Sequence, residues 1–218
     1  MSRSMFVFML IIVPFLALGL AYLGMVTLPT NAFGWFFLLM GLTYVVGGPL
    51  YLWKRRNEPP AQKEERSDRS FWLIQPGFII TIFGAPLDYL YLQTLPNPDW
   101  LPWLGLALVA LSIVLLVSAR QAIRGQFSGH LQIQPEHRLV QNGPYHFVRH
   151  PGYLGYMLLA LGIAVGYASL IAACAAFILL LPGLIYRIQV EEKLLVEAFG
   201  DEYRGYMRRT KRLVPGVW

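Results

Sequence analysis

The sequence is poor in charged residues and in cysteine. Only 14% of its 218 residues are charged, whereas a soluble domain usually carries about 25%. The 56% share of hydrophobic residues excludes an intrinsically disordered chain, which needs low hydrophobicity and high charge. A single cysteine, Cys174, excludes a disulfide scaffold. Its apolar surroundings predict a small buried side chain rather than a reactive thiol.

The sequence also lacks the short motifs of several soluble enzyme folds. It contains no Walker A motif, no G-x-G-x-x-G after a predicted strand and no G-x-S-x-G. These absences exclude the common soluble nucleotide-binding folds and the α/β-type esterases.

Long uncharged stretches take the place of those motifs. Residues 4–53 contain no Asp, Glu, Lys, Arg or His, which is too long for one membrane span of about 20 residues. The uncharged stretch Pro151–Tyr186 is also too long for one span and predicts two short spans with a turn near Gly166–Ser169. We therefore expect an all-α integral membrane protein with about six transmembrane helices. The other four spans are predicted at Met5–Val26, Phe33–Trp53, Phe71–Leu95 and Leu101–Ala119.

The positive charges predict the orientation of these spans. All 18 Lys and Arg residues fall on one side of a six-span arrangement. The positive-inside rule makes that side cytoplasmic, with both termini inside, in a bacterial inner membrane or in the endoplasmic reticulum. Orientation and contact with anionic membrane lipids therefore explain the net charge of +6 without a nucleic-acid partner.

The chain divides into two regions of different character. Residues 1–120 hold the first four membrane helices and a charged loop at 54–70, and Asp88 is expected to be an interfacial or helix-packing residue. Residues 121–218 hold a loop at 121–150, a helical hairpin at 151–186 and C-terminal helices at 187–218. All four histidines lie in the loop, but their spacing and the lack of acidic partners argue against a metal site.

The run from His137 to Gly155, HRLVQNGPYHFVRHPGYLG, is the most informative part of the chain. It reads as a Gly-Pro turn surrounded by cationic and aromatic groups, and it ends where a span begins. Pro151 suits a helix start, where the free N–H groups with Arg149 and His150 would attract an anion. Tyr145 and Tyr153 could face a sulfonium cation or a purine. An ordinary interfacial belt is the alternative.

The residues from Phe127 to Arg212 resemble the isoprenylcysteine carboxyl methyltransferases and their relatives, the phospholipid N-methyltransferases. The matching pieces are His137-x-Leu-Val, Gly143-x-Tyr145, Arg149-His150-Pro151-x-Tyr153-x-Gly155, Glu191-Glu192-x-x-Leu195 and Phe199-Gly200-x-Glu202-Tyr203-x-x-Tyr206. The resemblance implies that S-adenosylmethionine is bound between the cytoplasmic loop and the helix after the last span. The implied cofactor residues are Gln132, His137, Leu139, Val140, Tyr145, His150, Pro151, Gly152, Tyr153 and Glu191.

The resemblance also implies a substrate-binding arginine at Arg187, with Arg187 and Glu191 as the catalytic pair. Methyl transfer to a carboxylate needs no general base, because a carboxylate is ionised at pH 7, and Arg187 could hold it in a fork. The acceptor would then be a lipophilic small molecule or a prenylated group. A surface ion pair between Arg187 and Glu191 is the structural alternative.

Three other functions remain open at this point. A phospholipid N-methyltransferase would need a base for its amine acceptor, and Glu191, Glu192 or His150 would be the candidates. An NADPH-dependent membrane reductase or a non-enzymatic membrane protein would use the same scaffold without methyl transfer. The sequence does not indicate the oligomeric state.

Overall fold

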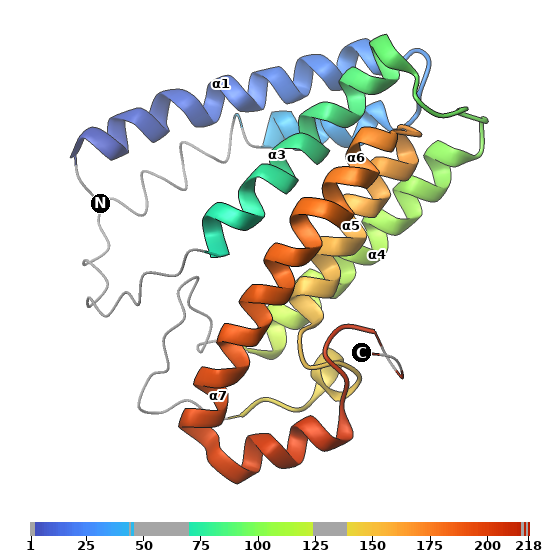
Figure 1. Ribbon diagram of the computed structural model, residues 1–218. Helices are drawn as coiled ribbons and strands as arrows, with labels where there is room; N and C mark the ends of the chain where they lie inside the picture. Colours follow the sequence, from blue (N-terminus) through green and yellow to red (C-terminus); the bar gives the residue numbers. More distant parts are fainter. Residues whose placement is uncertain (1–2, 44, 46–69, 124–138, 215, 217) are drawn as a thin grey trace.

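The computed structural model describes residues 3–43, 45, 70–123, 139–214, 216 and 218, and these residues form an all-helical protein (Figure 1). Within them the only extended pairing is an isolated parallel bridge between Val148 and Lys211. The predicted loop 54–70, apart from its last residue, and part of the predicted second span lie outside the described residues. The helices are α1 (Arg3–Thr27), the apolar helix Gly34–Thr43, α3 (Ser70–Leu87), α4 (Leu101–Ala122), α5 (Pro151–Gly166), α6 (Leu170–Cys174) and α7 (Leu181–Arg209).

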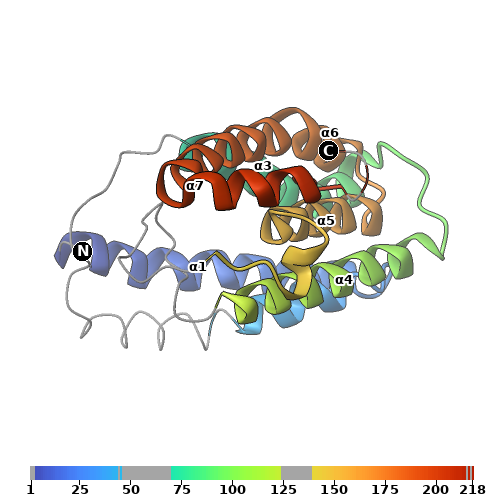
Figure 2. The same ribbon diagram turned by 90° about the horizontal axis from the view of Figure 1, so that it is seen from below.

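The helices have the length and composition of an integral membrane protein. Three helical runs are long and apolar enough to cross a bilayer, at Leu73–Leu92, Leu101–Ala122 and Leu170–Arg209. Shorter apolar helices add to them, among them α5. Helices α4, α5 and α6–α7 lie side by side in both views, with α3 beside α6 (Figures 1 and 2). The predicted all-α membrane fold is therefore confirmed.

The last hairpin turns where the sequence predicts it. Helix α5 ends at Gly166, Ala168 takes a positive φ of 48°, and Ser169 caps α6 by accepting a hydrogen bond from the Ala172 N–H at 3.1 Å. Helices α6 and α7 then continue through a π-helical segment, Ala175–Leu180, as one apolar run. The first part of α7 ends at Gly200 (φ 52°, ψ −123°), where the chain turns sharply before its last helical turns (Figure 1).

Glycine lets the two central helices approach closely. A Cβ on Gly105 of α4 would lie only 2.5 Å from the Cα of Gly166 in α5. Small residues at such contacts are typical of membrane helices, whose association depends on close backbone packing. Next to this contact, the rings of Phe33 and Phe37 each pack edge to face against the ring of Tyr167.

Asp88 is a buried packing residue rather than an exposed interfacial one. It is 1% exposed, and its Oδ2 accepts hydrogen bonds of 2.6 Å from the hydroxyls of Thr94 and Ser169. The carboxylate therefore joins the end of α3 to the start of α6. The prediction for Cys174 was wrong, because this side chain is exposed on the bundle. Its apolar neighbours belong to a lipid-facing surface, which sequence hydrophobicity does not distinguish from a core.

Candidate active site

The loop before α5 is held by the segment that follows α7. A short 3₁₀ turn, Gly143–His146, leads into an extended stretch that pairs with this segment. The Arg149 N–H donates to the Lys211 carbonyl at 2.8 Å, and the His150 N–H donates to the Arg212 carbonyl at 3.0 Å. Pro151 follows immediately and starts α5, where its missing N–H has no cost. The backbone of the predicted Arg-His-Pro motif is therefore fixed by residues about 60 positions away.

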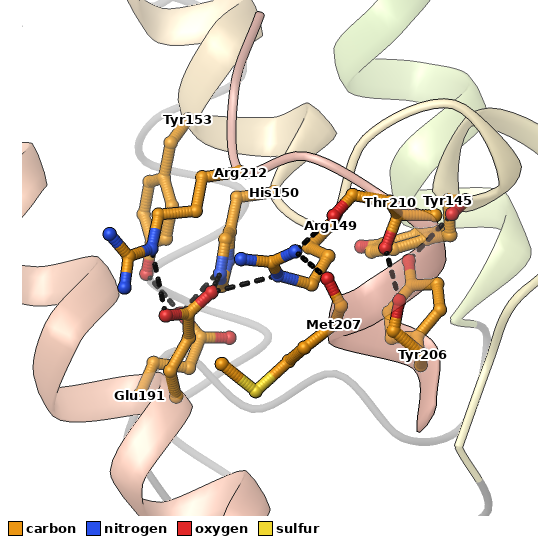
Figure 3. A network of polar contacts seen from close by, with 10 residues as sticks. Tyr145, Arg149, His150, Tyr153, Glu191, Tyr206, Met207, Thr210 and Arg212 are labelled. Atoms are coloured by element: carbon orange, nitrogen blue, oxygen red, sulfur yellow. Dashed lines mark hydrogen bonds and ion pairs between the residues drawn. The ribbon is translucent and has the colours of Figure 1, made fainter. Parts of the chain in front are cut away.

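A buried charge cluster lies beneath this backbone pairing (Figure 3). The Arg149 Nε donates to the Glu192 Oε1 at 2.8 Å, and the two side chains are 7% and 5% exposed. The Arg149 Nη1 also donates to the carbonyls of Met207 and Thr210. On the other side, the Arg212 Nε donates to the Glu192 Oε2 at 2.9 Å. Two arginines thus hold one carboxylate, and Arg149 ties the start of α5 to both parts of α7.

This environment determines the protonation state of Glu192. Burial alone would raise the pKa of its carboxyl group, but hydrogen bonds from His150 and Arg149 and their charges lower the pKa to about 2. Glu192 is therefore ionised at neutral pH and is a weak base there. The candidate base role that the sequence leaves open for Glu192 does not fit this chemistry.

The neighbouring Glu191 faces a different, more open environment. Its side chain is 31% exposed, and its Oε2 accepts a hydrogen bond from the Tyr153 hydroxyl at 2.8 Å. The same hydroxyl accepts a hydrogen bond from the Arg187 Nε at 3.2 Å. His150 Nδ1 lies 3.9 Å from the Glu191 Oε2. The phenol of Tyr153 therefore bridges the arginine and the carboxylate.

Aromatic side chains lie close to these polar groups. The Tyr206 hydroxyl donates to the Tyr145 carbonyl at 2.6 Å, which fixes the 3₁₀ turn against the last part of α7. Burial and the charge of Glu191 raise the pKa of Tyr145, so its phenol is neutral at physiological pH. The ring of His150 lies 5.7 Å from that of Tyr153. The hydroxyl of Tyr203 is buried and has no hydrogen-bond partner among the described residues.

The structure brings together six of the predicted site residues, namely Tyr145, His150, Pro151, Tyr153, Arg187 and Glu191. Gly152 lies in the first turn of α5, and Leu139 and Val140 are half-buried before the 3₁₀ turn. Predicted residues Gln132 and His137 lie outside the described residues.

Sequence reasoning did not find the buried cluster or the contribution of the segment after α7. One signal was available, because Leu184, Ile188 and Glu192 are spaced four apart and share one helix face. The first two are fully buried apolar residues, so the third position is also expected to face inward. A buried carboxylate requires cationic partners, which would have drawn attention to Arg149. The contribution of Arg212 has no comparable sequence signal.

Comparisons with known proteins show what this arrangement belongs to. The profile of the family described as phospholipid methyltransferase matches residues 100–202. Protein-S-isoprenylcysteine O-methyltransferase B of Arabidopsis thaliana is 28% identical over 151 residues, which are 66% of this chain and 77% of the relative. The protein-S-isoprenylcysteine O-methyltransferase of Schizosaccharomyces pombe is 31% identical over 103 residues, 46% of this chain and 44% of the relative. Over the residues that form the candidate site, the chain is therefore similar to this family of membrane methyltransferases.

The fold agrees with the similarity to membrane methyltransferases. The structure of a eukaryotic intramembrane Ras methyltransferase, an isoprenylcysteine carboxyl methyltransferase, matches with a TM-score of 0.58 and 21% identity. The match covers 85% of this chain and 66% of that one. Methanethiol S-methyltransferase 1 of Bradyrhizobium diazoefficiens is 40% identical over 72 residues, 33% of this chain and 24% of that protein. The family profile includes the start of α5 and the first part of α7, so it covers both sides of the candidate site.

Proposed function

We propose that this methyltransferase transfers a methyl group from S-adenosylmethionine to a carboxylate on a lipophilic, prenylated-type acceptor. The observation that carries the proposal is the arrangement of Arg187, Tyr153 and Glu191. One phenol contacts both an always-charged guanidinium and a partly exposed carboxylate, at 3.2 and 2.8 Å. The guanidinium suits an anionic acceptor, and the carboxylate suits a cofactor that carries hydroxyl groups and a positive charge.

The chemistry of the described residues fits S-adenosylmethionine. Its ribose presents two hydroxyl donors, which the Glu191 carboxylate can accept, and its sulfonium is favoured by aromatic faces such as those of Tyr145 and Tyr153. Among the described residues, none has an atom within 4 Å of a Cβ added to Gly152, so the first turn of α5 has open space beside it. Of the other predicted ligands, Gln132 and His137 belong to the loop before this site. The bound cofactor would supply the electrophilic methyl group.

Arg187 would align the acceptor. Its guanidinium is always charged and can hold both oxygens of a carboxylate in a fixed plane. An acceptor carboxylate is already ionised at pH 7, so alignment and partial removal of water are the main requirements for its attack. Tyr153 fixes the arginine through its phenol oxygen and therefore restricts the direction from which the carboxylate can approach.

The position of the site favours a lipophilic acceptor. Helix α7 carries both the last apolar run and the site residues, so an apolar tail can stay in lipid while its polar end reaches Arg187. The similarity to isoprenylcysteine O-methyltransferases supports such an acceptor. We also place the site and both termini in the cytoplasm, because all basic residues fall on one side of the membrane arrangement.

A phospholipid amine is the second candidate acceptor, favoured by the family description that matches residues 100–202. An amine must lose a proton before it attacks, so it needs a base. The low pKa of Glu192 removes one of the three candidates for that base and leaves Glu191 and His150. A carboxylate acceptor needs no base, and it is therefore the better-supported acceptor.

Kinetics of substitutions at Arg187 test the proposal. Purified protein in detergent is offered a farnesylcysteine analogue and a phosphatidylethanolamine, and methyl esters are separated from methylamines. Arg187→Lys keeps the charge but loses the planar fork, so we expect carboxyl methylation to fall about 100-fold while the affinity for S-adenosylhomocysteine changes little. Near-normal carboxyl methylation by Arg187→Ala refutes the assigned role.

Ligand binding separates the methyltransferase proposal from the remaining alternatives. S-adenosylhomocysteine is expected to raise the melting temperature of the protein, and NADPH is not. Stabilisation by NADPH alone would instead support a reductase. No stabilisation by either ligand would support a non-enzymatic membrane protein.

A further inference from the structure

The segment after α7 makes the backbone contacts that place the candidate cofactor residue His150. Its Lys211 and Arg212 carbonyls accept the N–H groups of Arg149 and His150 at 2.8 and 3.0 Å. The next residue, Pro151, has no N–H to donate, so these two bonds are the last backbone anchors before α5 begins. The position of His150 therefore depends on the segment Lys211–Trp218, which the proposed function does not include.

The side chain of Arg212 also affects the position of His150, through the buried carboxylate of Glu192. Its Nε donates to the Glu192 Oε2 at 2.9 Å, while the Arg149 Nε donates to the Glu192 Oε1 at 2.8 Å. Hydrogen bonds on both oxygens fix the plane of the carboxylate. The fixed Oε1 lies 3.4 Å from the His150 Nε2, so the orientation of the imidazole depends on this plane.

Trp218 holds Arg212 in place from the outer side. The guanidinium carbon of Arg212 lies 5.2 Å from the centre of the indole ring, within cation–π distance. The backbone around Trp218 is itself fixed, because its carbonyl accepts the N–H groups of Leu213 and Val214 at 2.8 and 2.9 Å. Leu213 is 4% exposed and anchors this turn in the protein.

We propose that Arg212 and Trp218 are positioning residues of the cofactor site. This inference rests on the proposed use of S-adenosylmethionine and extends it to residues that do not touch the cofactor. Arg212 fixes His150 twice, through its backbone carbonyl and through Glu192, and Trp218 restricts the rotamers of Arg212. Without the arginine side chain, the Glu192 carboxylate can rotate about its last bond, and His150 loses a fixed partner.

The test compares Arg212→Gln and Trp218→Ala with the unmodified full chain. We expect about a tenfold weaker affinity for S-adenosylhomocysteine and a similar rise in KM for S-adenosylmethionine, with the KM of the acceptor unchanged within about twofold. The melting temperature without ligand is expected to change little, because the Arg212 side chain is 30% exposed. Trp218→Phe keeps an aromatic face for the guanidinium and is expected to restore most of the lost affinity.

A matched control is available nearby in α7. Arg204→Gln removes an ion pair with Asp201 of almost the same length, 2.8 Å, but its side chains are 56% and 95% exposed. This variant should bind S-adenosylhomocysteine normally. Normal binding by Arg212→Gln would overturn the inference. A loss of affinity that only follows a loss of melting temperature, without rescue by Trp218→Phe, would overturn it as well.

Hydrogen exchange separates this inference from the proposed function. In the ligand-free protein, Arg212→Gln is expected to speed exchange at the His150 amide, whereas Arg204→Gln is not. Faster exchange together with no binding of S-adenosylhomocysteine by the unmodified protein would refute the proposed cofactor while confirming the structural link. Unchanged exchange at His150 would refute the link itself.

Discussion

The adjacent residues Glu191 and Glu192 are expected to respond very differently to the same chemical change. Replacing either one by Gln removes one negative charge and keeps a similar shape. The side chain of Glu192 is 5% exposed and is held by Arg149 and Arg212, whereas that of Glu191 is 31% exposed and contacts Tyr153. We therefore expect Glu192→Gln to reduce stability and Glu191→Gln to reduce cofactor binding.

The size of the first effect follows from the environment of Glu192. The contacts lower its pKa from an ordinary 4.5 to about 2. That difference is equivalent to about 3 kcal/mol of stabilisation of the ionised form. Breaking a buried ion pair by removing one partner costs a similar ~3–5 kcal/mol, because the other charge is left buried. For a chain of this size, a loss of about 3 kcal/mol lowers the melting temperature by about 10 °C.

The assay measures two quantities for each variant. Thermal unfolding in detergent without ligand reports stability, and calorimetric titration with S-adenosylhomocysteine below the melting temperature reports binding. Glu191→Gln is expected to melt within about 2 °C of the unmodified protein, since an exposed contact contributes less than about 1 kcal/mol, but to bind more weakly. Equal melting temperatures for the two variants would refute the assignment of Glu192 as the structural carboxylate.

Three further outcomes are expected. The folded-state pKa of Glu192 is lowered, so the stabilisation of the fold by its ionised carboxylate is present above the ordinary pKa of 4.5 and is lost as the pH falls towards 2. The stability difference between the unmodified protein and Glu192→Gln should therefore shrink over that range. Asp88→Asn should lower the melting temperature by weakening two charge-assisted hydrogen bonds, about 2 kcal/mol in total, but leave cofactor affinity unchanged because Asp88 contacts Ser169, beyond the end of α5 opposite to His150. In a Cys174→Ala background, a cysteine at Asp99 should react with an impermeant thiol reagent in intact cells and one at Asn142 should not; the reverse pattern would invert the proposed orientation.

The general architecture could be predicted because a bilayer imposes strong constraints on composition. Only helices and closed barrels satisfy backbone hydrogen bonds in lipid, so long uncharged runs predict helices directly. The turn at Gly166–Ser169 followed from length alone, since a straight helix over Pro151–Tyr186 would exceed the thickness of the hydrocarbon core. The same apolar composition led to the wrong prediction that Cys174 is buried, because lipid-facing and core-facing positions are equally apolar.

The motifs predicted residues that the structure brings together, but they did not predict how those residues contact one another. The sequence places Arg149 and Glu192 in separate motifs, and nothing in their spacing pairs them with each other rather than with a ligand. The pair forms because the turn between α5 and α6 returns the chain along α5, and Gly200 then redirects the end of α7 so that Lys211 lies beside Val148. A contact between residues 43 positions apart depends on this path, which local patterns do not encode.

Under the proposed function, the single helix α7 would hold the two reactants at different depths. Arg187 precedes Glu191 by four residues, so it lies about 6 Å nearer the apolar run along the helix axis. In the proposed reaction, a lipophilic acceptor would arrive from the bilayer and meet the arginine first, whereas a water-soluble cofactor would arrive from the loop side and meet the carboxylate. Tyr153, from the facing helix α5, contacts both residues and fixes the distance between them. Since methyl transfer is an in-line displacement, this two-sided arrangement would let acceptor and donor approach from opposite directions without sharing an entrance.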